Sequence, residues 1–169
     1  MAKSTFSGPV KSLAGFISAG VNNSVSLTAD TTLTVDAHAG KILLCNDADG
    51  KFTLPSIVST TPSDPTDPNQ TNNIGATFHF YIETAATDLD IKTDGTDKFK
   101  GAILIAVDDG AKKAFVPAAS NDVITMNGST KGGIVGSIVS FTAIDTATYL
   151  VHSSLLIGSG TIVTPYADA

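Results

Sequence analysis

Residues 75–83 read GATFHFYIE, and their side chains point to one kind of structure. Thr, His and Tyr at positions 77, 79 and 81 alternate with Phe, Phe and Ile at positions 78, 80 and 82. Strict alternation of apolar and more polar side chains is the pattern of a β-strand with one face on a core and the other toward solvent. The stretch therefore predicts a strand in a layered β protein.

The rest of the composition agrees with this strand. The chain has 169 residues, enough for one domain with a sizeable core. Only 15% of its residues are charged, every basic residue is Lys, and Glu83 is the one Glu. Thr, Val, Ile and Phe favour strands, and Asp, Asn and Gly favour turns. We expect an all-β protein, either an antiparallel β-sandwich or a jelly-roll-like barrel.

Turn signals suggest how the strands are connected. The runs 40–45 and 51–54 are expected to pair as neighbours through the turn NDADG. Residues 123–126 and 134–144 are expected to pair in the same way through Asn127-Gly128.

Two longer apolar runs also predict strands. Residues 100–107 form a nearly continuous apolar run, which predicts a strand buried on both faces. Residues 148–157 are expected to form the last long strand.

The chain divides into an arm, a body and a tail. Residues 1–24 form the expected extended N-terminal arm, which contains Lys3 and Lys11 but no acidic residue. Residues 25–157 form the β body, with an exposed loop at 56–73 that is rich in Pro and small polar residues. Residues 158–169 form a C-terminal tail.

Three groups of Asp residues resemble metal loops but are better explained as turns. Asp47-x-Asp49-Gly50 starts like a calcium loop, yet the twelfth position holds Val58 instead of a carboxylate. Residues 94–97 and 108–110 also have the composition of turns. A structural Ca²⁺ shared across a subunit contact is the alternative.

No other residues combine into a catalytic or cofactor motif. His38, His79 and His152 are far apart, and Cys45 in ILLC is expected to be a buried apolar side chain. The sequence contains neither a nucleophile elbow nor a phosphate loop. We expect no enzymatic activity, no catalytic residue, no metal site and no cofactor.

Charge and hydropathy argue against three further classes of protein: nucleic-acid-binding, membrane-spanning and secreted proteins. The net charge is −6 and the Lys residues are not clustered, which argues against nucleic-acid binding. No apolar run is long enough to cross a membrane, and the N-terminus lacks the continuous apolar core of a secretory signal.

Four stretches together resemble the small structural virion proteins of tailed bacteriophages, especially marine ones. Such proteins begin with a similar TFSGPV-type arm and end in a Gly-rich tail with a Thr-Pro-aromatic motif. Their penultimate strand often carries Trp, whereas this chain has TYL at 148–150. The stretches are TFSGPV at 5–10, TDKFKGAI at 96–103, NGSTKGGIVG at 127–136 and GSGTIVTPYA at 158–167.

The resemblance implies a capsid decoration, or cement, protein on the outer surface of the phage head. Its partners would be the major capsid protein and further copies of itself, in a homotrimer. The arm, with several large apolar side chains, would attach the β body to neighbouring coat subunits. The residues expected to make this contact are Phe6, Pro9, Lys11, Leu13, Phe16 and Ile17.

Other interpretations stay open. The protein could belong to the tail, the baseplate or a head fibre and bind host surface glycans, with loop 56–73 as the recognition tip. It could instead be a jelly-roll carbohydrate-binding module or hydrolase. The N-terminus could also be unstructured rather than a binding arm.

Overall fold

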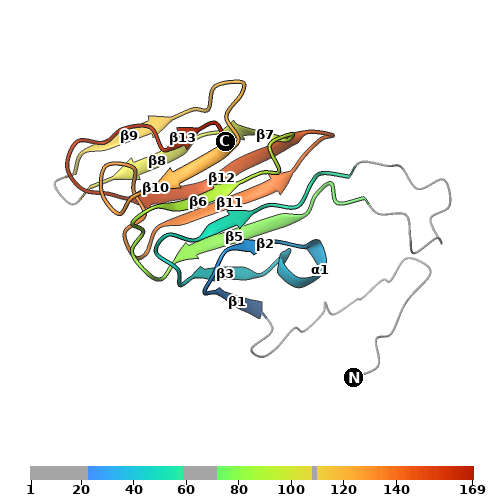
Figure 1. Cartoon of the computed structure of the whole chain (residues 1–169). Coiled ribbons are helices and arrows are strands. Elements are labelled where there is room, and N and C mark those ends of the chain that lie inside the picture. The colour runs from blue at the N-terminus through green and yellow to red at the C-terminus, as the bar shows by residue number, and fades with distance from the viewer. Residues whose placement is uncertain (1–22, 59–71, 108–109) are drawn as a thin grey trace, which may run out of the picture.

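The computed structural model describes residues 23–58, 72–107 and 110–169, and these form two β-sheets packed face to face (Figure 1). The predicted all-β class and the sandwich architecture are confirmed. Within the described ranges the sheets do not close into a barrel, so the jelly-roll-like alternative is not the observed form.

The larger sheet, sheet A, has eight strands. Their order is β1-β3-β5-β11-β12-β8-β9. The remaining strand, β7, pairs with residues 148–151 of β12, and β8 pairs with residues 155–157 of the same strand. The strands are β1 (Ser24–Leu27), β3 (Ile42–Cys45), β5 (Thr77–Ile82), β7 (Lys98–Gly101), β8 (Ile103–Ala106), β9 (Lys112–Phe115), β11 (Ile138–Ala143) and β12 (Thr148–Ile157).

The smaller sheet, sheet B, has five strands in the order β13-β10-β6-β4-β2. One short helix, α1 (Val35–His38), lies between β2 and β3. The strands are β2 (Thr31–Thr32), β4 (Lys51–Thr53), β6 (Leu89–Lys92), β10 (Val123–Met126) and β13 (Tyr166–Ala167).

The first six strands alternate between the two sheets. β1, β3 and β5 lie side by side and parallel in sheet A, while β2, β4 and β6 do the same in sheet B. The chain therefore winds around the core, adding one strand to each sheet per turn. The expectation of an antiparallel sandwich is corrected here, because both sheets are mixed.

The two expected hairpins are also corrected. β3 and β4 lie in opposite sheets, so the NDADG segment crosses the end of the core instead of turning back on itself. Gly50 is needed there because a Cβ would lie 2.7 Å from the ring of Phe52. Likewise β10 and β11 belong to different sheets, so the chain after Asn127-Gly128 passes from sheet B to sheet A instead of forming a hairpin.

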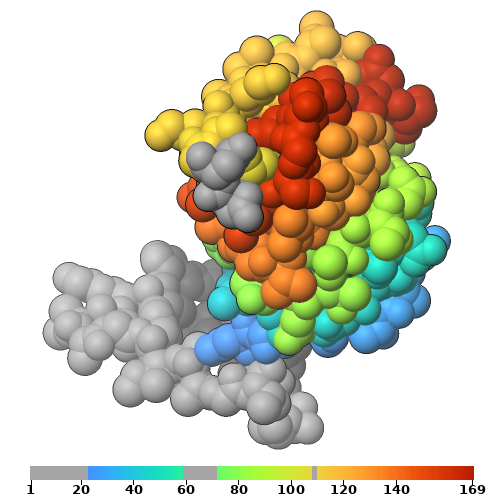
Figure 2. Space-filling view, turned by 90° about the vertical axis from the view of Figure 1, so that its left-hand side faces the viewer, coloured from blue at the N-terminus to red at the C-terminus, as the bar shows by residue number. Residues whose placement is uncertain are grey.

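The later strands close the sandwich with antiparallel pairs. β11 pairs with β5 and β12, and β10 pairs with β6 and β13. The C-terminal segment contributes β13 and buries Ile162 and Tyr166 in the core. Figure 2 shows this segment in red, running over the body between the residues around β9 and those around β10.

A chain of phenylalanines connects the two sheets. Phe52 of sheet B stacks on Phe80 of sheet A, with the ring centroids 6.3 Å apart. Phe141 lies 5.6 Å from Phe80 and 5.2 Å from Phe99 between centroids. These four rings are all buried, as the alternation in β5 predicts for Phe80.

The predicted continuous strand over residues 100–107 is interrupted. Gly101 has φ +105, and Ala102 separates β7 from β8. Leu104 in the middle of β8 is 37% exposed, so this run is not buried on both faces. By contrast, β12 spans the predicted residues 148–157.

Candidate functional site

The residues expected to contact a partner lie outside the described residues. They are Phe6, Pro9, Lys11, Leu13, Phe16 and Ile17. The described chain begins at Asn23, directly before β1. β1 is the outermost strand of sheet A, with β3 as its neighbour, so the arm starts at one edge of this sheet.

The face of sheet A that points away from sheet B carries a row of apolar side chains. The row crosses β3, β5, β11, β12 and β8, and each member pairs in register with the next. Its side chains are half-buried or exposed, whereas their neighbours along each strand are buried, apart from the half-buried Ser154 beside Leu155. We call this set the apolar row; it consists of Leu44, Tyr81, Ile138, Leu155 and Leu104.

A β-bulge places Leu155 in the row. Between the pairs Ile138↔Leu155 and Ser140↔His152, strand β12 has one residue more than β11. Ser153 lies in this bulge with φ +47, a conformation that non-glycine residues adopt rarely. The extra residue reverses the alternation, so that Leu155 faces outward and Leu156 is buried.

A shallow depression of about 400 Å³ lies on the same face. Its walls include Ile42 and three members of the apolar row, Leu44, Tyr81 and Ile138. Ser140 and Ser153 add hydroxyl groups to that of Tyr81, and His79 and Phe80 complete the lining. The depression is therefore predominantly apolar and has no charged carboxylate or ammonium group in its lining.

Hydrogen-bonded side chains form a polar border beside the apolar row. His79 Nδ1 lies 2.9 Å from Ser140 Oγ. Thr142 Oγ1 lies 2.8 Å from His152 Nε2 and 3.0 Å from Thr77 Oγ1. His79 and His152 thus lie on one face of sheet A, and each is hydrogen-bonded to a side chain of β11. His38 is instead on α1, where its ring Nδ1 lies 2.9 Å from the backbone N of Thr34.

The described residues contain no group of three or more His, Cys, Asp or Glu side chains able to hold a metal ion. Asp49 N–H points at Asp47 Oδ1 at 3.5 Å, and Thr96 N–H donates to Asp94 Oδ1 at 2.9 Å, as in turns. Cys45 is buried, as predicted, and burial raises the pKa of its thiol to about 12. Such a thiol is inert at neutral pH.

The start of loop 56–73 is held by polar contacts. Ser56 Oγ donates to Asp94 Oδ2 at 2.6 Å, and Ile57 N–H donates to Asp97 Oδ2 at 2.9 Å. Tyr149 Oη donates to the Pro55 carbonyl at 2.6 Å. Residues 59–71, which the glycan-binding alternative requires, lie outside the described residues.

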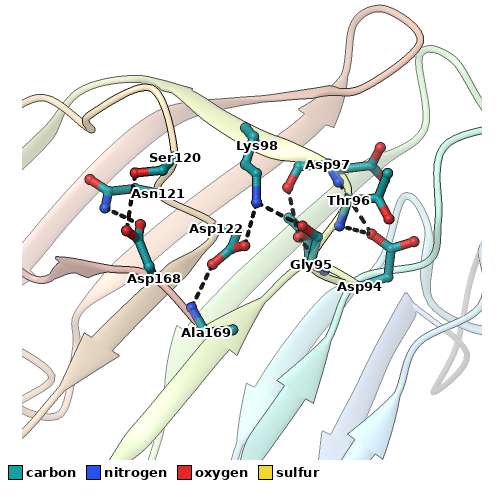
Figure 3. A network of polar contacts seen from close by, with 11 residues as sticks. Asp94, Gly95, Thr96, Asp97, Lys98, Ser120, Asn121, Asp122, Asp168 and Ala169 are labelled. Atoms are coloured by element: carbon teal, nitrogen blue, oxygen red, sulfur yellow. Dashed lines mark hydrogen bonds and ion pairs between the residues drawn. The ribbon is translucent and has the colours of Figure 1, made fainter.

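The turn at residues 94–97 leads into a second polar network, which fixes the C-terminus (Figure 3). Lys98 Nζ lies 2.6 Å from Asp122 Oδ2 and donates to the Gly95 carbonyl at 2.7 Å. Asp122 Oδ1 accepts the backbone N–H of Ala169 at 2.9 Å. Because these polar groups satisfy one another inside the fold, we interpret the network as structural.

Asp97 provides a pH-dependent test of the loop base. Burial raises its pKa above the ordinary value of 3.8, and the nearby Asp94 and Asp145 charges add to the rise. The native state then holds more protons than the unfolded state just above pH 3.8, so this group makes stability fall as the pH rises there. Asp97→Asn keeps an acceptor for Ile57 and should gain stability relative to the native protein as the pH rises above 3.8.

Urea unfolding of both proteins from pH 3 to pH 7 measures this difference. The contrasting variant is Asp145→Asn, measured in the Asp97→Asn background because the Asp145 charge also acts on Asp97; the backbone N–H of Ala147 and the Thr148 side chain lower the pKa of Asp145. A depressed pKa stabilises the native state above 3.8, so this variant should lose stability as the pH rises. The assignment would be contradicted if the stability of Asp97→Asn relative to the native protein fell, or did not change, as the pH rose above 3.8.

Comparisons of the chain with family models, with curated proteins and with solved structures find no match. Among the described residues, no helix combines the length and apolar character needed to cross a membrane. The apolar row and its depression are therefore identified by geometry alone. Sequence reasoning missed them, because the row arises from strands distant in the chain and from the bulge at Ser153.

Proposed function

We propose that the protein is a non-enzymatic structural protein of a bacteriophage virion that decorates the outer surface of the capsid. In this proposal the N-terminal arm binds neighbouring subunits of the major capsid protein and thereby stabilises the head. The sandwich body stands on the surface as a compact knob, and further copies of the chain complete a homotrimer.

One observation carries the proposal: an exposed apolar row crosses the outer face of sheet A, the sheet whose edge strand continues from the arm. Contiguous apolar surface on a small body indicates attachment to another macromolecule. Ile138 and Leu155, at the centre of the row, are 41% and 40% exposed. The virion assignment itself rests on the sequence resemblance.

The arm has the composition of a binding segment. Four large apolar side chains occur between Phe6 and Ile17, and the two basic residues are unopposed by acids. Burying each such side chain contributes roughly 1.5–3 kcal/mol before the cost of ordering the segment. Repetition over a capsid lattice would strengthen a modest contact by avidity.

Deletion of residues 1–17 should abolish capsid binding and leave the body folded, because the described core contains none of these residues. The measurement is occupancy of purified capsids after incubation with the full-length or the truncated protein, with circular dichroism as the folding check. A second arm variant, Leu13→Asp with Phe16→Asp, keeps the chain length and should lose binding as well.

Undiminished occupancy by the truncated protein would overturn the role of the arm. Labelling intact virions with an antibody and imaging them tests the location. A signal on the tail or baseplate would replace the head assignment with the host-binding alternative.

A further inference from the structure

We propose that the outer face of sheet A binds a second copy of this chain, in a reversible dimer whose two-fold axis runs along β12. The two sheets would lie face to face, so that the apolar row of each copy packs against the row of the other. The inference concerns the free protein in solution and does not rest on the proposed capsid function.

The register of sheet A makes this face self-complementary about β12. A two-fold axis along one strand places each residue opposite the residue that lies equally many strands away on the other side. Leu155 on β12 would therefore meet Leu155 of the second copy. One strand out, Ile138 on β11 would meet Leu104 on β8. Two strands out, Tyr81 on β5 would meet Ala114 on β9, so the largest side chain lies opposite the smallest.

The next outward position along the strands brings opposite charges together. Glu83 lies two residues after Tyr81, and Lys112 lies two residues before Ala114. Because β5 and β9 run in opposite directions, both positions lie toward the same end of the strands. Both side chains are exposed, and both lie two strands from β12. The two-fold axis therefore places Glu83 of one copy opposite Lys112 of the other, twice in each dimer.

These two charges are available for a contact between copies. Among the described residues, no ion pair includes Glu83 or Lys112. Glu83 Oε2 accepts a hydrogen bond from Asn46 Nδ2 at 2.6 Å, which holds the carboxylate at the edge of the apolar row. The outer face of sheet B differs, because Lys51 there forms an ion pair with Asp90 at 3.0 Å within one copy. Complementary charges across the sheet A contact would select this orientation of the two copies more than they add affinity.

The size of the matched surface predicts a weak dimer. It covers five neighbouring strands, about 24 Å, and three outward positions along each, about 20 Å, the third being the polar border. A flat area of roughly 500 Å² is smaller than the roughly 800 Å² that each partner contributes to a stable interface. Leu44 lies outside it, because β9 is the last strand of the described sheet on that side. We therefore expect association that rises with protein concentration, instead of a permanent dimer.

The two-fold contact is separate from the homotrimer of the proposed function. In a homotrimer each contact joins two different surfaces, whereas a two-fold contact joins one surface to itself. A coat subunit and a second copy cannot occupy the apolar row together. If the row contacts the coat, attachment to a capsid would replace the dimer contact.

A pair of charge reversals tests the register. Glu83→Lys places two ammonium groups opposite each other, and Lys112→Glu places two carboxylates opposite each other, so each variant alone should stay monomeric. Mixed in equal amounts, the two variants restore both opposite-charge pairs, so the mixture should regain the association of the native protein. Sedimentation velocity over a concentration series measures the association, with circular dichroism as the folding check.

Leu155→Asp should also remove the association, because the two-fold axis would bring two buried carboxylates together. Val163→Asp is the matched control, since Val163 is 42% exposed, lies outside the row and should leave the association unchanged. Lys92→Glu on the outer face of sheet B is the control for charge reversal and should also have no effect. Ile138→Asp serves as a second row variant if Leu155→Asp does not fold.

Three results would overturn the inference. A native protein that stays monomeric at every concentration would show that no second copy covers the row. Dimers or trimers that persist in Leu155→Asp would place the contact on another surface. Failure of the two charge-reversed variants to associate when mixed would contradict the two-fold register along β12. All three are read on the free protein without capsids, so they are separate from the capsid occupancy that tests the proposed function.

Discussion

Replacement of Phe141 by alanine should lower the free energy of unfolding by about 3–5 kcal/mol, the usual cost of removing a buried aromatic ring. Phe141 is fully buried, and its ring contacts those of Phe80 and Phe99. It lies on β11, which pairs with both β5 and β12 at the centre of sheet A. A cavity at this point removes contacts from several strands at once, and the surrounding rigid sheets cannot collapse to fill it.

Urea unfolding followed by circular dichroism measures this loss. The control is Ile144→Ala, which removes an apolar side chain that is 45% exposed, one residue beyond the end of β11. We expect the control to change stability by less than about 1 kcal/mol. Equal losses for the two variants would show that Phe141 does not hold the centre of the core.

Local pattern was sufficient to predict the strands but not their partners. The alternation in residues 77–82 and the run at 148–157 appear as β5 and β12 because each pattern is set within one strand. Pairing depends on contacts that are distant in the sequence. A short turn such as NDADG can join neighbouring strands or cross between sheets, and here the crossing places β3 and β4 on opposite sides of the core.

The outer surface was harder to predict for a related reason. Leu155 reads as part of a regular alternating strand, and only the bulge at Ser153 turns it outward. Leu104 reads as part of a continuous buried run, and only the break after Gly101 ends that run. The apolar row therefore depends on two backbone irregularities that cannot be predicted from the residue types.

Gly101→Ala should destabilise the protein by roughly 3 kcal/mol or more, because the backbone strain of a residue with positive φ adds to a steric overlap. The residue has φ +105, and a Cβ would lie 2.2 Å from the carbonyl oxygen of Val151. Gly101 and Val151 are paired in the parallel β7–β12 ladder, so neither strand can move without breaking it.

Gly95→Ala separates the two causes. Gly95 also has positive φ, at +91, but a Cβ there would meet nothing within 4 Å. It should therefore show only the conformational cost, about 1–2 kcal/mol. If chemical denaturation gives the same loss for both variants, the contact with Val151 is not the cause.

Gly101→Ala should also disturb the outer face of sheet A. Ser154 Oγ donates to the Ala102 carbonyl at 2.7 Å, so the break between β7 and β8 is tied to the bulge in β12. An alanine at position 101 would push the end of β7 away from β12 and, through Ala102, shift the start of β8, where Leu104 pairs with Leu155 of the row. In Gly101→Ala protein that still folds, the backbone amide chemical shifts of Leu104 and Leu155 should change more than that of Tyr81, which lies two strands away from β12. Unchanged amide shifts at Leu104 and Leu155 would show that the row does not depend on this backbone irregularity.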